Sequence, residues 1–260
     1  MGELLVPFVF FSPFKNPMAK SPKLFSFPDE PAPIFEGFSK ETFAFLHGLK
    51  RNNNKEWFEA HRGEYERYLR EPSKALAHAM GAYFRERKMP IIGNAKTSLF
   101  RINRDIRFSK DKSPYKTHVG LSFPLEGTKK EEWCGYYIGF EPTETGKGMS
   151  VFAGGGIYHP MPPHLKRIRA LIDREQKTFA KILDLPSFKK VYPKGLTGES
   201  LKRIPQGYSE DHPAANYLKM KSFLFGCDLK EGELLKENLP EVLGERFEAA
   251  LPLIKFLGRS

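Results

Sequence analysis

The spacing of hydrophobic positions predicts that a helix opens the folded region. From Ser39 onward, apolar residues recur three apart at Phe43, Leu46 and Leu49, which is the spacing of one helix face. Ser39 is a suitable N-cap, and the asparagines at 52–54 mark the end of the segment. We therefore expect a first helix between these two signals.

Two further helices are expected to follow directly. Asn54 can cap the second, whose aromatic residues fall three and four apart and so share one face. Pro72 is tolerated in the first turn of a third helix, which we expect to reach about residue 88. The residues that these two helices would bury are Trp57, His61, Tyr65, Tyr68, Leu76, Met80 and Tyr83.

The pattern changes to alternation in the middle of the chain. Residues 119–123 alternate between apolar and small or polar side chains, which is typical of a half-buried strand. Two apolar segments, 133–142 and 148–155, flank the sequence TETGKG, whose glycines suit a hairpin turn. These segments predict an antiparallel sheet.

Helical spacing returns after the predicted sheet. A long helix is expected from Pro162 to about residue 182, and shorter helices are expected around Phe188, Tyr217 and Phe247. Strands clustered in mid-chain between helical blocks indicate an α+β fold, with an antiparallel sheet packed by N-terminal and C-terminal helices. We expect residues 37–260 to form one such domain.

The first 36 residues are rich in proline and phenylalanine and have no sustained period. They predict an extended arm whose aromatic side chains dock on the domain. Met18 begins a plausible alternative start of the protein. The apolar run near Leu4 is interrupted by Pro7 and is shorter than the ~20 residues of a membrane span.

These features, together with the cysteines, bear on the location of the protein. Glu3 stands where a secretory signal would carry basic residues. Cys134 and Cys227 are the only cysteines, which excludes a disulfide framework and a cysteine-based zinc site. We expect a cytoplasmic protein with no membrane partner, no metal and no cofactor.

The net charge of +11 is concentrated in two segments. Residues 91–118 carry seven Lys and Arg against two Asp, and residues 161–206 carry eleven against four Asp and Glu. A basic balance favours partners that bear phosphate groups, although solvated basic surfaces are also common.

The densest candidate for chemistry is RINRDIRFSKDKSPYKTH, residues 101–118. In one interpretation, Asp105 and Asp111 pair with neighbouring cations in an ionic lattice that fixes an irregular loop. In the other, which we favour, the cations converge on phosphate or carboxylate. The residues that would then bind a ligand are Arg101, Arg104, Arg107, Lys110, Lys112, Tyr115 and Lys116.

Two other segments could contribute to such a site. In GGGIYHP, residues 154–160, Gly155 and Gly156 could donate backbone N–H groups to an anion, but they could equally serve a bulge or tight packing. KRIPQGYSEDHP, residues 202–213, supplies Arg203 and Tyr208 as ligand-binding candidates. Within it, Asp211 could orient His212 as a general base, but a helix N-cap is the favoured role of Asp211.

The chain resembles an uncharacterised bacterial and fungal family, the domain of unknown function DUF2461. The resemblance is carried by NNNKEWF at residues 52–58 and by the three segments above, which occur in the family's order over about residues 37–225. Tyr158 departs from the family pattern, which usually has Trp at this position. The resemblance implies a single α+β domain and no assigned activity.

These observations together favour one anion-binding cleft built from the loop at 101–116, the glycines at 154–156 and the loop at 203–212. The cleft would bind or process a phosphorylated or otherwise anionic small molecule, with Asp105, Asp111 or His212 as candidates for proton transfer. One alternative is a sequence-nonspecific RNA- or DNA-binding module, in which the basic loop and the helix from Leu165 to Lys181 form a continuous stripe. Another is an interaction scaffold in which the ion pairs are purely structural.

Overall fold

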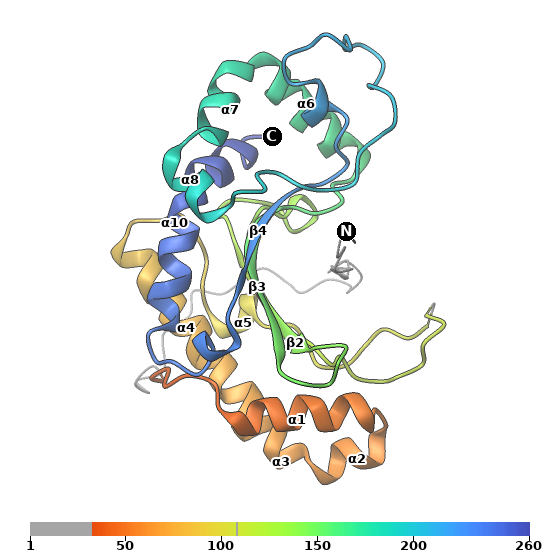
Figure 1. Ribbon diagram of the computed structural model, residues 1–260, viewed down its shortest axis with the longest axis vertical. Coiled ribbons are helices and arrows are strands. Elements are labelled where there is room, and N and C mark those ends of the chain that lie inside the picture. Colours follow the sequence, from red (N-terminus) through yellow and green to blue (C-terminus); the bar gives the residue numbers. More distant parts are fainter. Residues whose placement is uncertain (1–32, 108) are drawn as a thin grey trace. The chain divides into compact units, whose positions relative to one another are not determined.

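The computed structural model describes residues 33–107 and 109–260, which form an α+β fold with a four-stranded antiparallel sheet (Figure 1). The fold class predicted from the sequence is thus confirmed. Residues 1–32 of the predicted arm, which include the alternative start at Met18, lie outside the described residues. Phe35, at the end of that predicted arm, is buried and its ring packs 5.6 Å from the ring of Phe38.

The first two predicted helices are present with the predicted caps. Helix α1 (Lys40–Arg51) begins at Ser39 with a capping box, in which Ser39 Oγ accepts from Thr42 N–H and Thr42 Oγ1 accepts from Ser39 N–H. Helix α2 (Lys55–Ala60) begins at Asn54, whose side chain accepts from Trp57 N–H at 2.9 Å.

The chain then remains helical almost without interruption as far as Glu86. Helix α3 (Arg62–Glu64) leads into a π-helical turn, η1 (Tyr65–Arg70), and η1 leads directly into α4 (Glu71–Glu86). Pro72 lies in the first turn of α4, as its sequence position predicts. A short helix, α5 (Ala95–Ser98), follows, and its N-cap is Asn94.

The sheet has the order β1-β2-β3-β4, and all neighbouring strands are antiparallel. At one end Val119 pairs with Phe140 and Phe140 with Val151, whereas at the other end Ile157 pairs with Phe223. β4 was not among the predicted strands. The strands are β1 (Val119–Pro124), β2 (Gly135–Pro142), β3 (Met149–Ile157) and β4 (Phe223–Leu229).

The core lies between the sheet and α10 (Leu239–Leu257), the longest described helix. The ring of Tyr136 on β2 stacks on Phe247 of α10 with 4.4 Å between centroids, and its hydroxyl donates to Phe247 O at 2.7 Å. Phe84 of α4 contacts Phe123 of β1 from the same side. The expectation of a short helix around Phe247 is wrong, because α10 extends over 19 residues, ten of which are buried.

The long helix expected from Pro162 is divided into α6 (Pro162–Arg174) and α7 (Gln176–Leu183). Glu175 between them leaves the helical conformation, with φ −116° and ψ 32°. Its carboxylate accepts hydrogen bonds from Arg174 and from Arg259 near the C-terminus. No helix among the described residues is long and apolar enough to cross a membrane. The remaining short helices are η2 (Lys130–Glu132), α8 (Pro186–Val191), α9 (Ala215–Leu218) and η3 (Glu231–Glu233).

Candidate functional site

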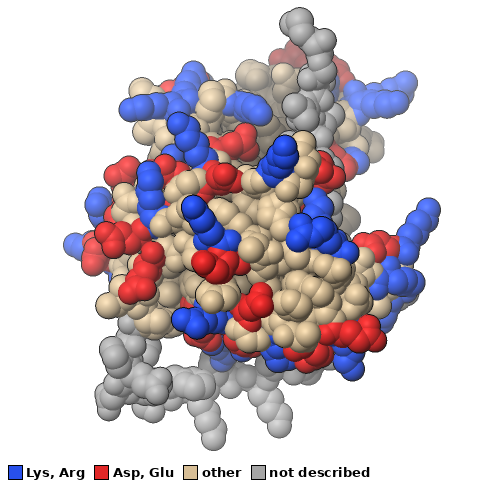
Figure 2. All heavy atoms as spheres, turned by 60° about the horizontal axis from the view of Figure 1, so that its bottom comes forward, with Lys and Arg blue, Asp and Glu red and all other residues tan. Residues whose placement is uncertain are grey.

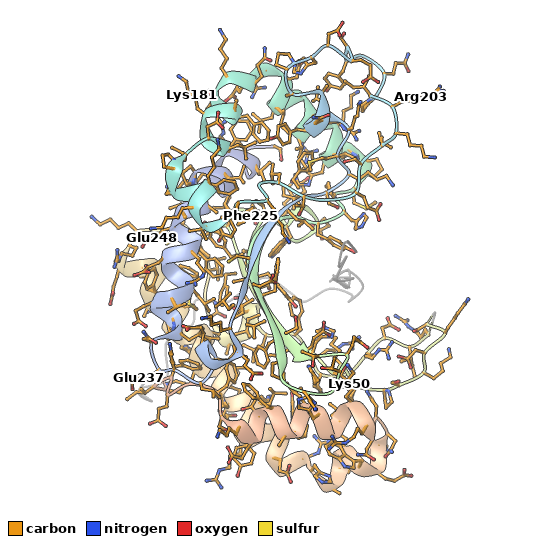
Figure 3. All side chains as sticks on the ribbon, viewed as in Figure 1. Lys50, Lys181, Arg203, Phe225, Glu237 and Glu248 are labelled. Carbon is orange, nitrogen blue, oxygen red and sulfur yellow. The ribbon has the colours of Figure 1, made fainter. Side chains whose placement is uncertain are left out.

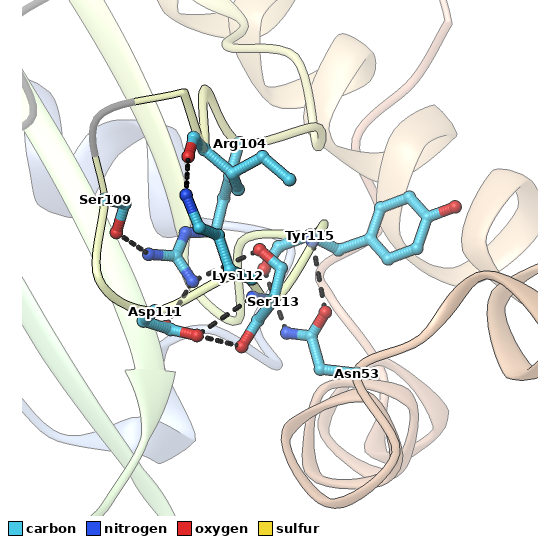
Figure 4. A network of polar contacts seen from close by, with 8 residues as sticks. Asn53, Arg104, Ser109, Asp111, Lys112, Ser113 and Tyr115 are labelled. Carbon is cyan, nitrogen blue, oxygen red and sulfur yellow. Dashed lines mark hydrogen bonds and ion pairs between the residues drawn. The ribbon is translucent and has the colours of Figure 1, made fainter.

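The basic segment at 101–118 forms an irregular hairpin that leads into β1. Asn103 and Tyr115 form a β-bridge at its base, and Lys116 N–H donates to Ile102 O at 2.8 Å. Asn53, from the loop between α1 and α2, fixes the same point (Figure 4). Its amide donates to Tyr115 O at 2.9 Å and accepts from Tyr115 N–H at 3.1 Å. Two segments that carry the family resemblance therefore meet at this contact.

Two of the three predicted anion-binding arginines are held by carboxylates of their own loop. Arg104, whose side chain is 14% exposed, donates to Asp111 and to Ser113 O (Figure 4). Arg107 makes a bidentate pair with Asp105 at 2.9 and 2.7 Å. These contacts are the ones that the ionic-lattice interpretation expects.

The same contacts bear on the two aspartates proposed for proton transfer. Hydrogen bonds from Ser113, together with the Arg104 guanidinium, hold the pKa of Asp111 far below its usual range. Hydrogen bonds from Arg107 do the same for the pKa of Asp105. A carboxylate with so low a pKa accepts a proton poorly near neutral pH. The geometry therefore gives no support to catalytic roles of Asp105 and Asp111.

Three further candidates on this loop, Lys110, Lys112 and Tyr115, differ in their surroundings. Lys112 donates to Ile106 O at 3.0 Å within the loop, and Lys110 is exposed at the loop tip. Tyr115 is buried, with its ring stacked 4.0 Å from that of Phe58. The loop tip thus presents lysines to solvent, whereas Tyr115 anchors the base of the loop to α2.

Arg101 and Lys116 differ from the paired arginines. Neither makes an ion pair with any carboxylate among residues 33–107 and 109–260. Arg101 is exposed, and Lys116 is partly buried with its Nζ 5.4 Å from the ring centroid of Phe100. Burial and the nearby charge of Arg101 lower the pKa of Lys116. Two neighbouring positive charges without a carboxylate form a site that an anion would stabilise.

Arg101 also lines a groove of about 700 Å³, which lies between the helices from α2 to the start of α4 and the segment 95–103. Five cationic side chains and only two carboxylates line this groove, and the aromatic rings of Phe58, Tyr65 and Tyr115 also contribute to it. The cations are Lys55, Arg62, Arg70, Lys74 and Arg101, and the carboxylates are Glu59 and Glu66.

Most groove cations on the helices are paired at the surface. Arg62 donates to Glu59 at 2.8 and 2.6 Å, and Arg70 donates to Glu66 at 3.1 and 2.8 Å. Exposed helical pairs of this kind contribute only about 0.3–0.5 kcal/mol each. An incoming anion would therefore have to displace a weakly held carboxylate to reach either guanidinium group.

The π-helical turn η1 supplies three of the groove residues: Tyr65, Glu66 and Arg70. π-helical turns occur inside α-helices and are frequent at functional sites. Here the turn lies between α3 and α4, so that residues on either side of it face the same groove. This turn and the groove residues Lys55, Arg62, Arg70, Lys74 and Phe100 were not among the sequence candidates. Helical spacing alone gives no sign of a π-turn, and the opposite wall of the groove is distant in sequence.

The glycines at 154–156 lie inside β3 and not in a turn. Gly154 pairs with Tyr137 and Gly226, and Gly156 pairs with Gly135 and Leu224. Because the strand is hydrogen-bonded on both sides, its backbone N–H groups are not arranged around an anion. Close packing is instead their structural role: a Cβ atom on Gly155 would lie 2.3 Å from Gly135 O. The placement of Gly155 and Gly156 in an anion-binding turn is thus corrected.

The loop at 203–212 lies at the opposite end of the sheet from the basic hairpin. The hairpin precedes Val119, whereas this loop leads toward Phe223, and about 20 Å of strand separates these ends. Figure 3 shows Arg203 far from Lys50, whose Nζ donates to Pro142 O at the hairpin end. The expectation that the hairpin, the glycines and this loop build one cleft is therefore wrong.

His212 has a structural environment within its loop. Its Nε2 lies 3.0 Å from Asp173 of α6, and its Nδ1 accepts from Ala214 N–H at 3.0 Å. Both ring nitrogens are thus engaged, which leaves no lone pair for a substrate proton. The predicted N-cap is also corrected, because His212 and not Asp211 accepts the hydrogen bond before α9. Nearby, burial and the charge of Asp173 raise the pKa of Tyr208.

The clamp between Asn53 and Tyr115 gives a first testable prediction. We expect Asn53→Ala to lower the free energy of unfolding by about 1–3 kcal/mol, because it leaves the backbone N–H and C=O of Tyr115 without their partners. Urea unfolding measures the loss, and hydrogen exchange at the Tyr115 amide should accelerate. Asn216→Ala, on the exposed side of α9, is the control. Equal stability of the two variants would contradict the assignment.

The chain matches a known protein family over most of its length. A family model described as conserved hypothetical protein (DUF2461) matches residues 41–256, which include the groove, the basic hairpin and the sheet. The resemblance expected from the motifs is confirmed, and the match extends further toward the C-terminus than they indicated. A search of curated proteins found no match. Within the described part of the chain, no three His, Cys, Asp or Glu side chains are grouped to hold a metal ion.

Proposed function

The chain belongs to the conserved hypothetical protein family DUF2461, and we propose from the geometry of its groove that it binds a compact anionic molecule there. The observation that carries this proposal is the pair of neighbouring cations, Arg101 and Lys116, which have no carboxylate partner among the described residues. The ligand would place its phosphate or carboxylate against these two side chains.

The surroundings of Arg101 support binding of a small ligand. Ligand pockets commonly have volumes of about 300–1,000 Å³, and the groove of about 700 Å³ falls in this range. The guanidinium group can donate two parallel hydrogen bonds to one anion, and such charge-assisted bonds are stronger than neutral ones. Arg62 and Arg70 can add further donors by exchanging their exposed carboxylate partners for the ligand.

The observations give less support to the nucleic-acid alternative. Arg167 of α6 pairs with Glu132, and Arg169 donates to Met220 O. These side chains belong to the end of the sheet remote from the basic hairpin, so the two basic segments do not form one stripe. Figure 2 shows acidic side chains interspersed among the basic ones over the face it presents, which weakens attraction for an extended polyanion.

Calorimetric titration with inorganic pyrophosphate tests the proposal. We expect saturable binding to the full-length protein and a Kd at least 10-fold higher for Arg101→Ala, because hydrogen bonds to charged groups contribute about 1.5–3 kcal/mol. Lys181→Ala, which removes one exposed charge on α7, is the matched control and should bind as the wild type does. The proposal fails if pyrophosphate does not bind, or if both variants lose affinity equally.

A further inference from the structure

An exposed aromatic ring lies at the rim of the groove, next to the proposed anion site. Phe100 is 41% exposed and lines the groove. Every other phenylalanine among residues 33–107 and 109–260 is buried or half-buried. A ring of this size loses favourable burial when it faces water, so its exposed surface is available for a ligand.

The position of Phe100 relative to the cations restricts what such a ligand can be. Phe100 directly precedes Arg101, and the Nζ of Lys116 lies 5.4 Å from its ring centroid. The ammonium lies over the ring, close enough for a cation–π contact, so Lys116 covers one face of Phe100 and leaves the other face for a ligand. A molecule in the groove therefore meets the ring of Phe100 and the charge of Arg101 together, and the charge of Lys116 lies close to both.

We propose that the ligand of this groove is a phosphate ester that carries a planar aromatic ring, as a nucleoside monophosphate does. This inference rests on the proposed function and names its ligand class. The phosphate binds between Arg101 and Lys116, and the planar ring stacks on Phe100. Stacking of a nucleic-acid base on an aromatic side chain is worth enough for the ring to dominate selectivity among phosphates.

A mononucleotide fits the groove better than a nucleic-acid strand does. Single-strand binding uses a series of aromatic side chains on which successive bases stack, along a positively charged track. Among the described residues that line this groove, Phe100 is the exposed ring, whereas Phe58 and Tyr115 are buried and stacked on each other. One exposed ring, Phe100, beside two cations without a carboxylate partner among the described residues, Arg101 and Lys116, matches a ligand with one base and one phosphate.

The experiment compares phosphate compounds with and without the planar ring. Wild-type protein is titrated with inorganic phosphate, ribose 5-phosphate and adenosine monophosphate. We expect adenosine monophosphate to bind at least 10-fold more tightly than ribose 5-phosphate. Phe100→Ala should abolish this difference, whereas Phe100→Trp should preserve it because it retains an aromatic face.

The possible failures are distinguishable from one another. In one outcome, ribose 5-phosphate and adenosine monophosphate bind with equal affinity, and Arg101→Ala weakens the binding of both. The inference about the ring is then overturned, and the proposed anion site stands. If neither pyrophosphate nor any of the three ligands binds, both proposals are overturned. If a single-stranded oligonucleotide binds far more tightly than the mononucleotide, with an affinity that falls steeply with salt, the nucleic-acid alternative replaces the inference.

Discussion

Replacement of Gly156 by alanine is expected to lower the free energy of unfolding by more than about 4 kcal/mol, and so to abolish folding at 37 °C or nearly so. Gly156 has φ +117°, a conformation that residues with a side chain rarely adopt. A Cβ atom there would also lie 1.9 Å from Phe223 O, a backbone atom of β4. The strand cannot move away without breaking its pairing with β3.

Gly195→Ala is the control that separates the cost of a positive φ from the cost of the steric contact. Gly195 has φ +63°, and nothing lies within 4 Å of a Cβ atom built there. We expect this control to cost only about 1 kcal/mol, as a left-handed alanine does. Urea unfolding followed by circular dichroism measures both variants. A Gly156→Ala protein as stable as Gly195→Ala would show that β3 and β4 are not so closely packed.

The free energy of unfolding is also expected to depend on pH through His118. Burial, together with the charges of Lys116 and Arg104, lowers the pKa of this imidazole to about 4 in the folded protein. Its pKa in the unfolded chain is about 6.5. The unfolded state therefore binds a proton first as the pH falls. Stability from this residue is complete above about pH 6.5, and it decreases by about 3 kcal/mol as the pH falls to about 4.

A comparison of pH profiles isolates this effect from the carboxylates, which titrate in part of the same range. His118→Gln retains a polar side chain of similar size but has no group that titrates there. Between pH 7 and pH 4, the variant should lose less stability than the wild type by about 3 kcal/mol. Parallel profiles of the two proteins would exclude His118 as the source of acid sensitivity.

The N-terminal helices were predictable because their signals are local. The caps at Ser39 and Asn54 lie within three residues of the N–H groups they bind, and such spacings are visible in a sequence. β4 was missed because its outward-facing positions carry Leu224 and Gly226, which hides the alternation of a half-buried strand. The contact of Glu175 with Arg259, 84 residues away, is likewise not visible in the pattern around Glu175.

The candidate site was predictable only in part, for a similar reason. The basic hairpin was identified by its composition, but its two paired arginines could not be distinguished from Arg101 by spacing alone. The partners that distinguish them are fixed by the fold of the loop. The other groove wall comes from helices about 30 to 45 residues earlier, whose charged faces resemble ordinary solvated surfaces. Likewise, the partner of His212 is Asp173 and not its neighbour Asp211.

The pairing of β3 with β4 also has a consequence for the order of folding. The two strands are adjacent in the sheet, yet residues 158–222 separate them in the chain. During synthesis, β1, β2 and β3 can pair through local turns. The other edge of β3 stays unpaired until β4 has been synthesised. Its glycine-rich edge would remain open to other extended chains until β4 arrives. We expect fragments that end before Phe223 to aggregate, and a nascent chain of that length to be a substrate for chaperones.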